Sequence, residues 1–385
     1  MKNIKDFDFK GKKVILRLDL NVPIKDGKIL SEEKINSSLE TINYIRDNGG
    51  KLIILSHLGK IKKEEDKLNN TLFIVYQNLL NKYSNIYFSS STHGKILEDK
   101  IDLLNNEDIL LVENTRFEDL QEKKESNCDE ELSRYWASLG DIFINDAFGM
   151  THRRHASNYG ISKYLPSGIG FLIEKEIEGL KPIIHPSNPF IIIMGGAKVT
   201  DKLDVIKGIL PKCDHLLVGG GIANTFLACK YNTGKSLIDA DKIAELKLLL
   251  KEYNEKIIYP KDVVVEENGK VREEQVDSLS DESIIYDIGS KTIEEYSKYI
   301  NNAATIFING TMGLYENPNY EKGTKEILKI IEESSGIKVA GGGDALASIE
   351  KFNIKNLNYK STGGGATLEY IKTGKLYCFD DNLIN

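Results

Sequence analysis

The stretch PFIIIMGGAK, residues 189–198, sets the architecture of the second half of this 385-residue chain, because an apolar run stops there at two glycines. Similar runs end in HLLVGGG (215–221), ATIFINGTMG (304–313) and IKVAGGGD (337–344), and STGGGA (361–366) adds a fifth glycine cluster. Glycine lets backbone N–H groups approach an anion, and a helix that follows adds partial positive charge. Five clusters in one half predict a binding edge for a phosphorylated ligand.

In the first half, four apolar runs end in polar side chains instead. These runs are KKVILRLDLNVP (12–23), KLIILSHLGK (51–60), DILLVENTRF (108–117) and DIFINDAFGMTHRRH (141–155), which lead to Asp19, Asn21, His57, Lys60, Asn114, Arg116, Asp146, His152 and Arg153. Helix-like stretches such as EKINSSLETINYIRDN (33–48) lie between them. Apolar strands that alternate with helices predict a mainly parallel sheet covered on both faces. Ligands of such sheets gather beyond the carboxyl ends of the strands.

Length and patterning predict two α/β lobes joined by a helix. We expect an N-terminal lobe over residues 1–170, completed by the tail 371–385, which is too short to be a domain and must dock. A connecting helix and hinge follows over 171–188, ending near Pro186 and Pro189, and the C-terminal lobe covers 189–370.

Composition narrows the function classes. A net charge of −7 speaks against a broad nucleic-acid surface, and no apolar run approaches the ~20 residues that span a membrane. The N-terminus lacks the apolar core of a secretory signal, and four scattered cysteines form no CxxC pair, so we expect a cytoplasmic protein with reduced thiols.

Asp19 and Asn21 lie two residues apart, so on an extended strand both side chains face one polar ligand. The alternative is a strand-end turn that these Asx side chains cap. A second group would form a basic pocket for a small anionic substrate if its members converge, namely Lys34, His57, Lys60, Arg116, His152 and Arg153. Taken singly, each is more often a solvated charge.

Lys198 and Lys202 are spaced to share one helix face, where two ammonium groups would meet a polyphosphate, although a plain solvent-facing helix is the rival interpretation. Asp344 at a glycine-rich helix start is a candidate ligand for Mg²⁺ on a nucleotide, or a simple N-cap. NTGKS (232–236) is no P-loop, because Cys229 stands where that motif needs glycine, and no GxGxxG fingerprint supports an NAD-dependent oxidoreductase.

The motifs RLDLNVP, SHLGK, ENTRF, NDAFGMTHRRHAS, GFLIEKE, GGAKVTDK, GGGIANTFL, NGTMGLYE, GGGD and STGGGATLE resemble phosphoglycerate kinase from Val14 to about Lys375. The resemblance implies two Rossmann-like lobes. The first would hold 3-phosphoglycerate or 1,3-bisphosphoglycerate, and the second ADP or ATP with Mg²⁺. A hinge would close them for phosphoryl transfer in glycolysis or gluconeogenesis, in a monomer without nucleic-acid or membrane partners.

The resemblance also implies residue roles. The substrate positions are Asp19, Asn21, Lys34, His57, Lys60, Arg116 and Arg153. The nucleotide positions are Gly196, Ala197, Lys198, Lys202, Gly221, Asn309, Glu316, Gly341, Gly342, Gly343 and Asp344, with Glu316 on the ribose and Asp344 on the metal. The transferring phosphoryl would meet Lys34, Lys198 and the backbone amides of Gly342 and Gly364.

This chain also departs from the family pattern. Lysines replace arginines at Lys34 and Lys60, keeping the charge but losing the planar fork. Further departures in the nucleotide half are Asn224, Ile285, Thr311 and Ala345. Two hypotheses stay open: an active kinase that uses these lysines, or a catalytically weak paralogue that binds the same ligands in a regulatory or scaffold role.

Overall fold

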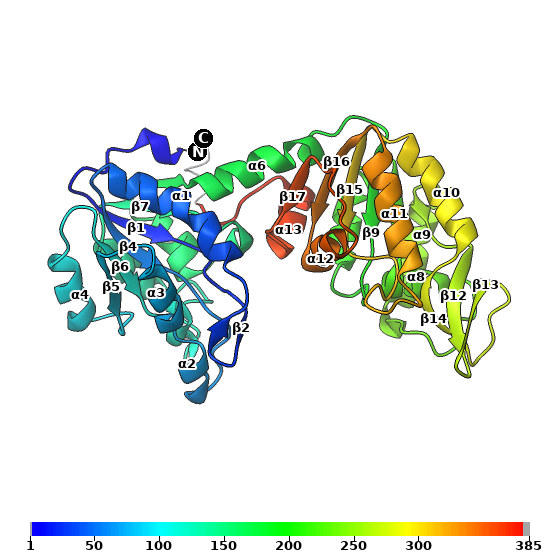
Figure 1. Ribbon diagram of the computed structural model, residues 1–385, viewed down its shortest axis with the longest axis horizontal. Coiled ribbons are helices and arrows are strands. Elements are labelled where there is room, and N and C mark those ends of the chain that lie inside the picture. The colour runs from blue at the N-terminus through cyan, green and yellow to red at the C-terminus, as the bar shows by residue number, and fades with distance from the viewer. Residues whose placement is uncertain (1, 380–385) are drawn as a thin grey trace. The chain divides into compact units, whose positions relative to one another are not determined.

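The computed structural model describes residues 2–379, and the chain divides into two compact units (Figure 1). Unit 1 comprises Met1–Ile177 with Lys375–Asn385, and unit 2 comprises Glu178–Gly374. The boundary falls inside helix α6 (Phe171–Ile184), which ends just before Pro186 as its sequence predicts. Residues 380–385 of the expected tail lie outside the described residues.

Unit 1 is built on a six-stranded sheet in the order β5-β6-β4-β1-β7-β8, with every neighbouring pair parallel. Its strands are β1 (Lys13–Arg17), β4 (Lys51–Leu55), β5 (Ile86–Ser89), β6 (Ile109–Val112), β7 (Ile142–Asn145) and β8 (Ser167–Ile169). The helices are α1 (Glu33–Asp47), α2 (Glu65–Asn69), α3 (Phe73–Leu79), α4 (Lys95–Asp102), α5 (Glu130–Ser138) and the start of α6, and a small hairpin joins β2 (Ile24–Lys25) to β3 (Lys28–Ile29). The parallel sheet predicted from the apolar runs is confirmed.

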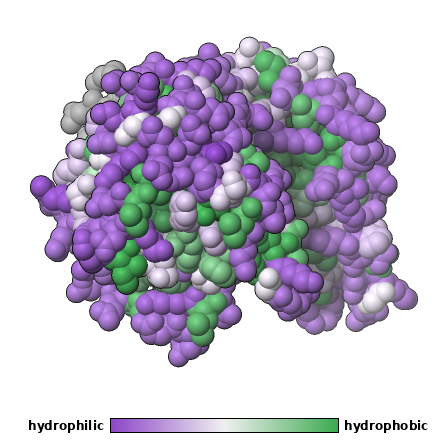
Figure 2. All heavy atoms as spheres, turned by 60° about the vertical axis from the view of Figure 1, so that its left-hand side comes forward, coloured by the Kyte–Doolittle hydropathy of each residue, from purple (hydrophilic) through white to green (hydrophobic). Residues whose placement is uncertain are grey.

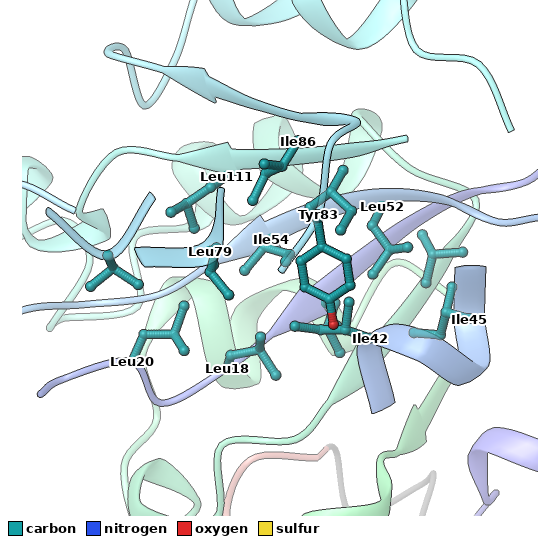
Figure 3. Packing of buried hydrophobic residues seen from close by; sticks show 14 of the residues in the cluster. Leu18, Leu20, Ile42, Ile45, Leu52, Ile54, Leu79, Tyr83, Ile86 and Leu111 are labelled. Carbon is teal, nitrogen blue, oxygen red and sulfur yellow. The ribbon is translucent and has the colours of Figure 1, made fainter. Parts of the chain in front are cut away.

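Both faces of this sheet are buried, which explains why its strands are continuously apolar. Val14 and Leu16 face one cluster, which includes Ile42 of α1 and Leu79 of α3 (Figure 3). Residues in between, such as Ile15 in β1 and Ile53 in β4, join a second cluster on the opposite face, together with residues of α4 and α5. Alternation along each strand therefore feeds two cores.

Unit 2 repeats the plan with the strand order β11-β10-β9-β15-β16-β17, again all parallel. The strands are β9 (Phe190–Met194), β10 (His215–Val218), β11 (Ile257–Ile258), β15 (Thr305–Asn309), β16 (Ile337–Gly341) and β17 (Tyr359–Ser361). An antiparallel sheet adds β12 (Asp262–Glu267), β13 (Lys270–Gln275) and β14 (Ile284–Ile288). The helices are α7 (Leu203–Ile209), α8 (Gly220–Leu227), α9 (Ile243–Glu252), α10 (Ser290–Asn301), α11 (Lys322–Glu333), α12 (Gly343–Lys351) and α13 (Gly365–Thr373).

Each sheet has a point where the chain reverses its direction of growth. In unit 1 this point lies between β1 and β7, and in unit 2 between β9 and β15. The loops after the two central strands diverge there and leave a crevice, which is where ligands of open α/β sheets bind. The polar runs of unit 1 and the glycine clusters of unit 2 follow strands at these edges.

Residues 375–379 pack on unit 1, whereas residues 371–374, which the sequence analysis assigned to the tail, belong to unit 2 at the end of α13. The Tyr377 N–H donates to the Thr151 carbonyl oxygen (2.8 Å), and Cys378 and Phe379 are buried. Hydrophilic side chains predominate on the face shown in Figure 2, with smaller hydrophobic areas between them. Among residues 2–379, no helix combines the length and apolar character needed to cross a bilayer.

Candidate functional site

The centre of the unit 1 site is Arg17, a residue that the sequence analysis did not select. It ends β1 and is completely buried. Its Nε donates to Ser157 Oγ (2.9 Å), and its Nη2 lies 3.3 Å from His57 Nδ1. The only local sign of it in the sequence is an arginine at the end of an otherwise apolar strand.

A buried carboxylate stands behind this arginine. Glu125 accepts the Ser157 N–H at its Oε2 (2.9 Å) and the Ser157 hydroxyl at its Oε1. Ser157 therefore links Glu125 to the Arg17 guanidinium. The negative charge of Glu125 opposes the fall in the pKa of Arg17 that burial causes. Arg17, Ser157 and Glu125 form one enclosed network, the Arg17 network, beneath the site surface.

The histidines of this cluster are neutral at pH 7. Burial lowers the pKa of His57 well below its usual value, and the charges of Arg17 and Arg116 lower it further. The pKa of His155 falls to about 3 for the same two reasons, even though its Nδ1 lies 3.8 Å from Glu125 Oε1. Burial and the surrounding guanidinium groups outweigh that one carboxylate. His57 is therefore a polar group rather than one of the cations predicted for the basic pocket.

Arg116 is a buried cation with free hydrogen-bonding capacity. It is 8% exposed, its Nη1 donates to the Gly59 carbonyl oxygen (3.3 Å), and its buried Nε has no hydrogen-bond partner. Burial lowers its pKa, and the nearby charge of Arg153 contributes. A buried guanidinium with unused donors suits an anionic ligand. Arg153 itself is exposed, as is Lys60 on the loop after Gly59.

The predicted strand carrying Asp19 and Asn21 is wrong, because β1 ends at Arg17. The Asn21 N–H donates to Asp19 Oδ1 (3.2 Å), which is the Asx turn weighed as the alternative. Asn21 Oδ1 accepts the Gly59 N–H (2.9 Å), and Asp19 Oδ2 pairs with Lys34 Nζ at 2.8 Å. The turn thus brings the predicted Asp19, Asn21 and Lys34 into one contact chain.

Two other polar strand-end residues are structural. Asn114 is fully buried and bonds the backbone of Leu58 and Asn70, so it ties neighbouring loops together. Asp146 is also fully buried; it accepts the Thr41 hydroxyl and the Ile173 N–H, which holds the start of α6. Burial raises the pKa of Asp146 to about 7.

In unit 2 the glycine clusters follow strands β9, β10, β15, β16 and β17 at one edge of the sheet. Three of them lead directly into helices, with Gly219, Gly342 and Gly364 as the N-caps of α8, α12 and α13. At the start of α8, the Gly220 and Ile222 N–H groups already donate to the Met312 and Gly196 carbonyl oxygens (2.8 and 3.2 Å). The first N–H groups of α12 and α13, at Gly343 and Gly365, make no such bond within residues 2–379 and remain open to an anion. The clusters that begin at Gly195 and Gly310 lead into turns, so they are not followed directly by a helix.

The predicted helix face shared by Lys198 and Lys202 is wrong, because α7 begins only at Leu203. Lys198 is exposed, whereas Lys202 Nζ turns inward to the Gly195 carbonyl oxygen (2.6 Å) and to Asn309 Oδ1. This contact joins the ends of β9 and β15 at the reversal point of the sheet. Burial lowers the pKa of Lys202 to about 8, although the charges of Asp344 and Asp201 oppose the shift.

The side chain of Asn309 is used within the protein. Its Nδ2 donates to the Gly341 carbonyl oxygen (2.7 Å), so it connects the ends of β15 and β16. A Cβ at Gly342 would lie 2.5 Å from this Nδ2, and the φ of Gly342 is +96°. A Cβ at Gly221 would lie 1.9 Å from the Ala197 carbonyl oxygen. These close approaches leave no room for a side chain, so both positions require glycine.

A cavity of about 490 Å³ opens along this edge. Of the predicted nucleotide residues, its lining includes Gly196, Ala197, Gly221, Glu316 and Asp344. Apolar and aromatic residues complete its wall, among them Ile285, Met312 and Leu314. The volume and the mixture of apolar wall and polar rim suit a nucleotide-sized ligand.

Asp344 is an exposed carboxylate on the first turn of α12, two residues after the N-cap Gly342, so the rival N-cap interpretation is wrong. Among residues 2–379, no three His, Cys, Asp or Glu side chains gather into a metal site. Mg²⁺ that is carried by a nucleotide needs only one or two protein carboxylates. A single carboxylate on the cavity wall fits that requirement.

The fold and the site define a class: a two-unit α/β phosphotransferase with a cationic strand edge in one unit and a glycine-rich edge in the other. Comparisons with known proteins specify it further. The sequence model described as phosphoglycerate kinase matches residues 4–375. Similar proteins include the phosphoglycerate kinases of Lacticaseibacillus casei, 45% identical over 378 residues with 96% of each chain covered, and of Levilactobacillus brevis, 45% identical over 384 residues with the same coverage.

Solved structures agree. The phosphoglycerate kinase of Coxiella burnetii superposes with a TM-score of 0.86 at 32% identity, covering 98% of this chain and 97% of that one. The enzyme of Pyrococcus horikoshii gives a TM-score of 0.83 at 33% identity, with the same coverage. The chain therefore belongs to the phosphoglycerate kinase family.

Proposed function

We propose that this chain catalyses the reversible, Mg²⁺-dependent transfer of a phosphoryl group from 1,3-bisphosphoglycerate to ADP, giving 3-phosphoglycerate and ATP. The observation that carries the proposal is the pair of ligand edges in a chain that matches the family over residues 4–375. One edge offers the unused donors of a buried arginine, and the other offers the starts of α12 and α13, whose first N–H groups are free for phosphate.

Unit 1 would bind the phosphoglycerate. Arg116 and Arg153 would neutralise its anionic groups, while neutral His57 would donate or accept a hydrogen bond without adding charge. Lys34, held by Asp19, would lie beside the transferring phosphoryl. Lys60 and Asn21 would complete the site. The Arg17 network would position this set from beneath, because Arg17 lies 3.3 Å from His57 and 2.9 Å from Ser157.

Unit 2 would bind the nucleotide. The backbone at Gly196, Ala197 and Gly221 would lie along it, and Glu316 would accept hydrogen bonds from the ribose hydroxyls. Lys198, Lys202 and the amides at Gly342 and Gly364 would face the phosphates. Magnesium held by Asp344 and the phosphate oxygens would supply further charge neutralisation. Phosphoryl transfer depends mainly on such positioning and charge stabilisation.

The two reactants occupy different units in this scheme, so direct transfer requires them to meet during turnover. A hinge at the connecting segment 171–188, a monomeric state and a cytoplasmic location remain predictions. Light scattering of the purified protein tests the monomer. Small-angle scattering with and without both ligands tests the hinge.

The direct test of the activity is ATP formation from ADP and 1,3-bisphosphoglycerate in a coupled assay with Mg²⁺. We expect turnover that disappears when the metal is chelated. The relatives named above are all kinases, and nothing in the structure favours the weak paralogue. The hypothesis of a weak paralogue would replace the proposed kinase activity if the protein bound 3-phosphoglycerate and ADP with no measurable turnover.

A further inference from the structure

Helix α8 carries a polar side chain that is free to bond a ligand in the cavity of unit 2. Asn224 is only 4% exposed and lines the cavity of unit 2. Its side-chain amide makes no hydrogen bond to any residue of the described chain 2–379. The amide atoms are not among the fully enclosed unpaired ones, so they are reached from the cavity that Asn224 lines. Their hydrogen-bonding capacity is therefore available to a ligand in that cavity.

The surroundings of Asn224 leave space next to it. Gly220, Gly221 and Ala223 of the same helix also line the cavity, and none has a side chain larger than a methyl group. The lining also includes apolar side chains, among them Ile285 and Met312. A flat aromatic base would pack against these side chains, and the amide would then be a polar group within its reach.

We propose that Asn224 recognises the purine base of the nucleotide through its side-chain amide. This inference rests on the proposed nucleotide site. An amide offers one acceptor oxygen and one donor NH₂ group. The amino group at position 6 of adenine and its neighbouring ring nitrogen present the complementary donor and acceptor.

The absence of a protein partner adds a second consequence. Because no hydrogen bond fixes the amide, it turns by 180° at little cost and exchanges its donor for its acceptor. A keto purine presents an acceptor oxygen beside a ring N–H, which the turned amide matches. Asn224 therefore accepts both amino and keto purines, and discriminates against a purine that has no substituent at position 6.

Equilibrium binding tests this without depending on turnover. The probes are ADP, IDP and purine riboside 5′-diphosphate, which lacks the substituent at position 6. For the wild type we expect similar affinities for ADP and IDP, and binding of the unsubstituted purine about fivefold to tenfold weaker, the effect of one neutral hydrogen bond. In Asn224→Leu, ADP binds more weakly and its advantage over the unsubstituted purine disappears.

A stability measurement separates recognition from a structural role. Because the amide is unpaired in the free protein, Asn224→Leu should keep or raise the melting temperature, whereas loss of a structural contact would lower it. Thr225→Val is the matched control: its buried hydroxyl donates to the Gly221 carbonyl oxygen (3.0 Å), so the change alters stability but not the ratio of affinities.

Two results would overturn the inference: an unchanged preference for ADP over the unsubstituted purine in Asn224→Leu, or a melting temperature well below that of the wild type. A wild type that binds ADP at least tenfold more tightly than IDP would overturn the turning of the amide. A protein that binds these nucleotides without catalysis would remove the proposed function and leave the base recognition intact.

Discussion

Nucleotide binding should take up a proton at Lys202. Burial holds the pKa of its ammonium at about 8 in the free protein, so a substantial fraction is neutral above that pH. A phosphate beside it favours the charged form and raises the pKa again. Lys202 Nζ already lies 3.4 Å from where a Cβ of Gly196 would stand, and Gly196 lines the cavity. The bound anion would therefore act on Lys202 at short range.

The size of the effect follows from the shifted pKa of about 8. About half of the Lys202 side chains are charged at pH 8 and about a tenth at pH 9, so full protonation in the complex takes up about 0.5 and about 0.9 proton. Because protons are taken up, affinity falls as the pH rises, by up to about tenfold per pH unit well above pH 8.

Titration calorimetry with Mg²⁺-free ADP, in two buffers of different ionisation enthalpy at pH 8 and pH 9, measures this uptake. The phosphate of ADP adds little there, because its second pKa is about 6. Lys202→Arg keeps its charge throughout and should abolish the uptake, while Lys235→Arg, at an exposed lysine on the same cavity, should retain it. Equal uptake by the wild type and Lys202→Arg would refute the reasoning.

Three further predictions concern unit 1. Lys34→Arg should raise kcat by restoring a planar fork, and Lys34→Ala should lower it by about a thousandfold or more in the coupled assay; an alanine variant as fast as the wild type would exclude Lys34 from the reaction. Glu125→Gln should lower the free energy of unfolding by about 3 kcal/mol, because it removes the larger of the two carboxylate charges, Glu125 and Asp19, that offset the burial of Arg17. In urea titrations the exposed Glu122→Gln should stay within about 0.5 kcal/mol of wild type, and equal values for both variants would contradict the network. His155 has a folded pKa of about 3 against a usual 6.5, so its contribution to stability is present above pH 6.5 and is lost as the pH falls. Between pH 6.5 and 5 the loss is about 1.6 kcal/mol. In melts over this pH range His155→Asn should show a smaller loss of stability than the wild type, and an equal loss in both would contradict the role of His155.

The local pattern of apolar and polar residues was sufficient to predict the strands, the helices and the parallel sheets. Strands such as β9 and β15 are continuous apolar runs that end where glycine or polar residues begin, and both properties depend on neighbours in the sequence. Because parallel strands place their carboxyl ends at one edge, the glycine clusters had to meet there. The helix starting at Gly343 was equally predictable from the apolar spacing that follows Asp344.

Local pattern failed where a distant partner decides the conformation. The segment from Lys198 to Lys202 looks helical, yet Lys202 instead bonds Gly195 and Asn309, and the helix starts one residue later. Arg17 looked like an ordinary strand residue, because its partner Ser157 lies 140 residues away. No periodicity within a short window reports such pairings.

The sequence by itself determined the class of the chain, the edge of each sheet that binds ligands and the residue types available there, because periodicity and turn chemistry act over a few residues. Only the tertiary structure decided the protonation states of those residues and which of their hydrogen-bonding groups remain unpaired. Burial among guanidinium groups makes His57 and His155 neutral, and burial alone lowers the pKa of Lys202 to about 8. The amide of Asn224 lines the cavity of unit 2 without a hydrogen-bond partner among residues 2–379. Charge and hydrogen bonding depend on what surrounds a group in space, and residues far apart in the chain supply those surroundings.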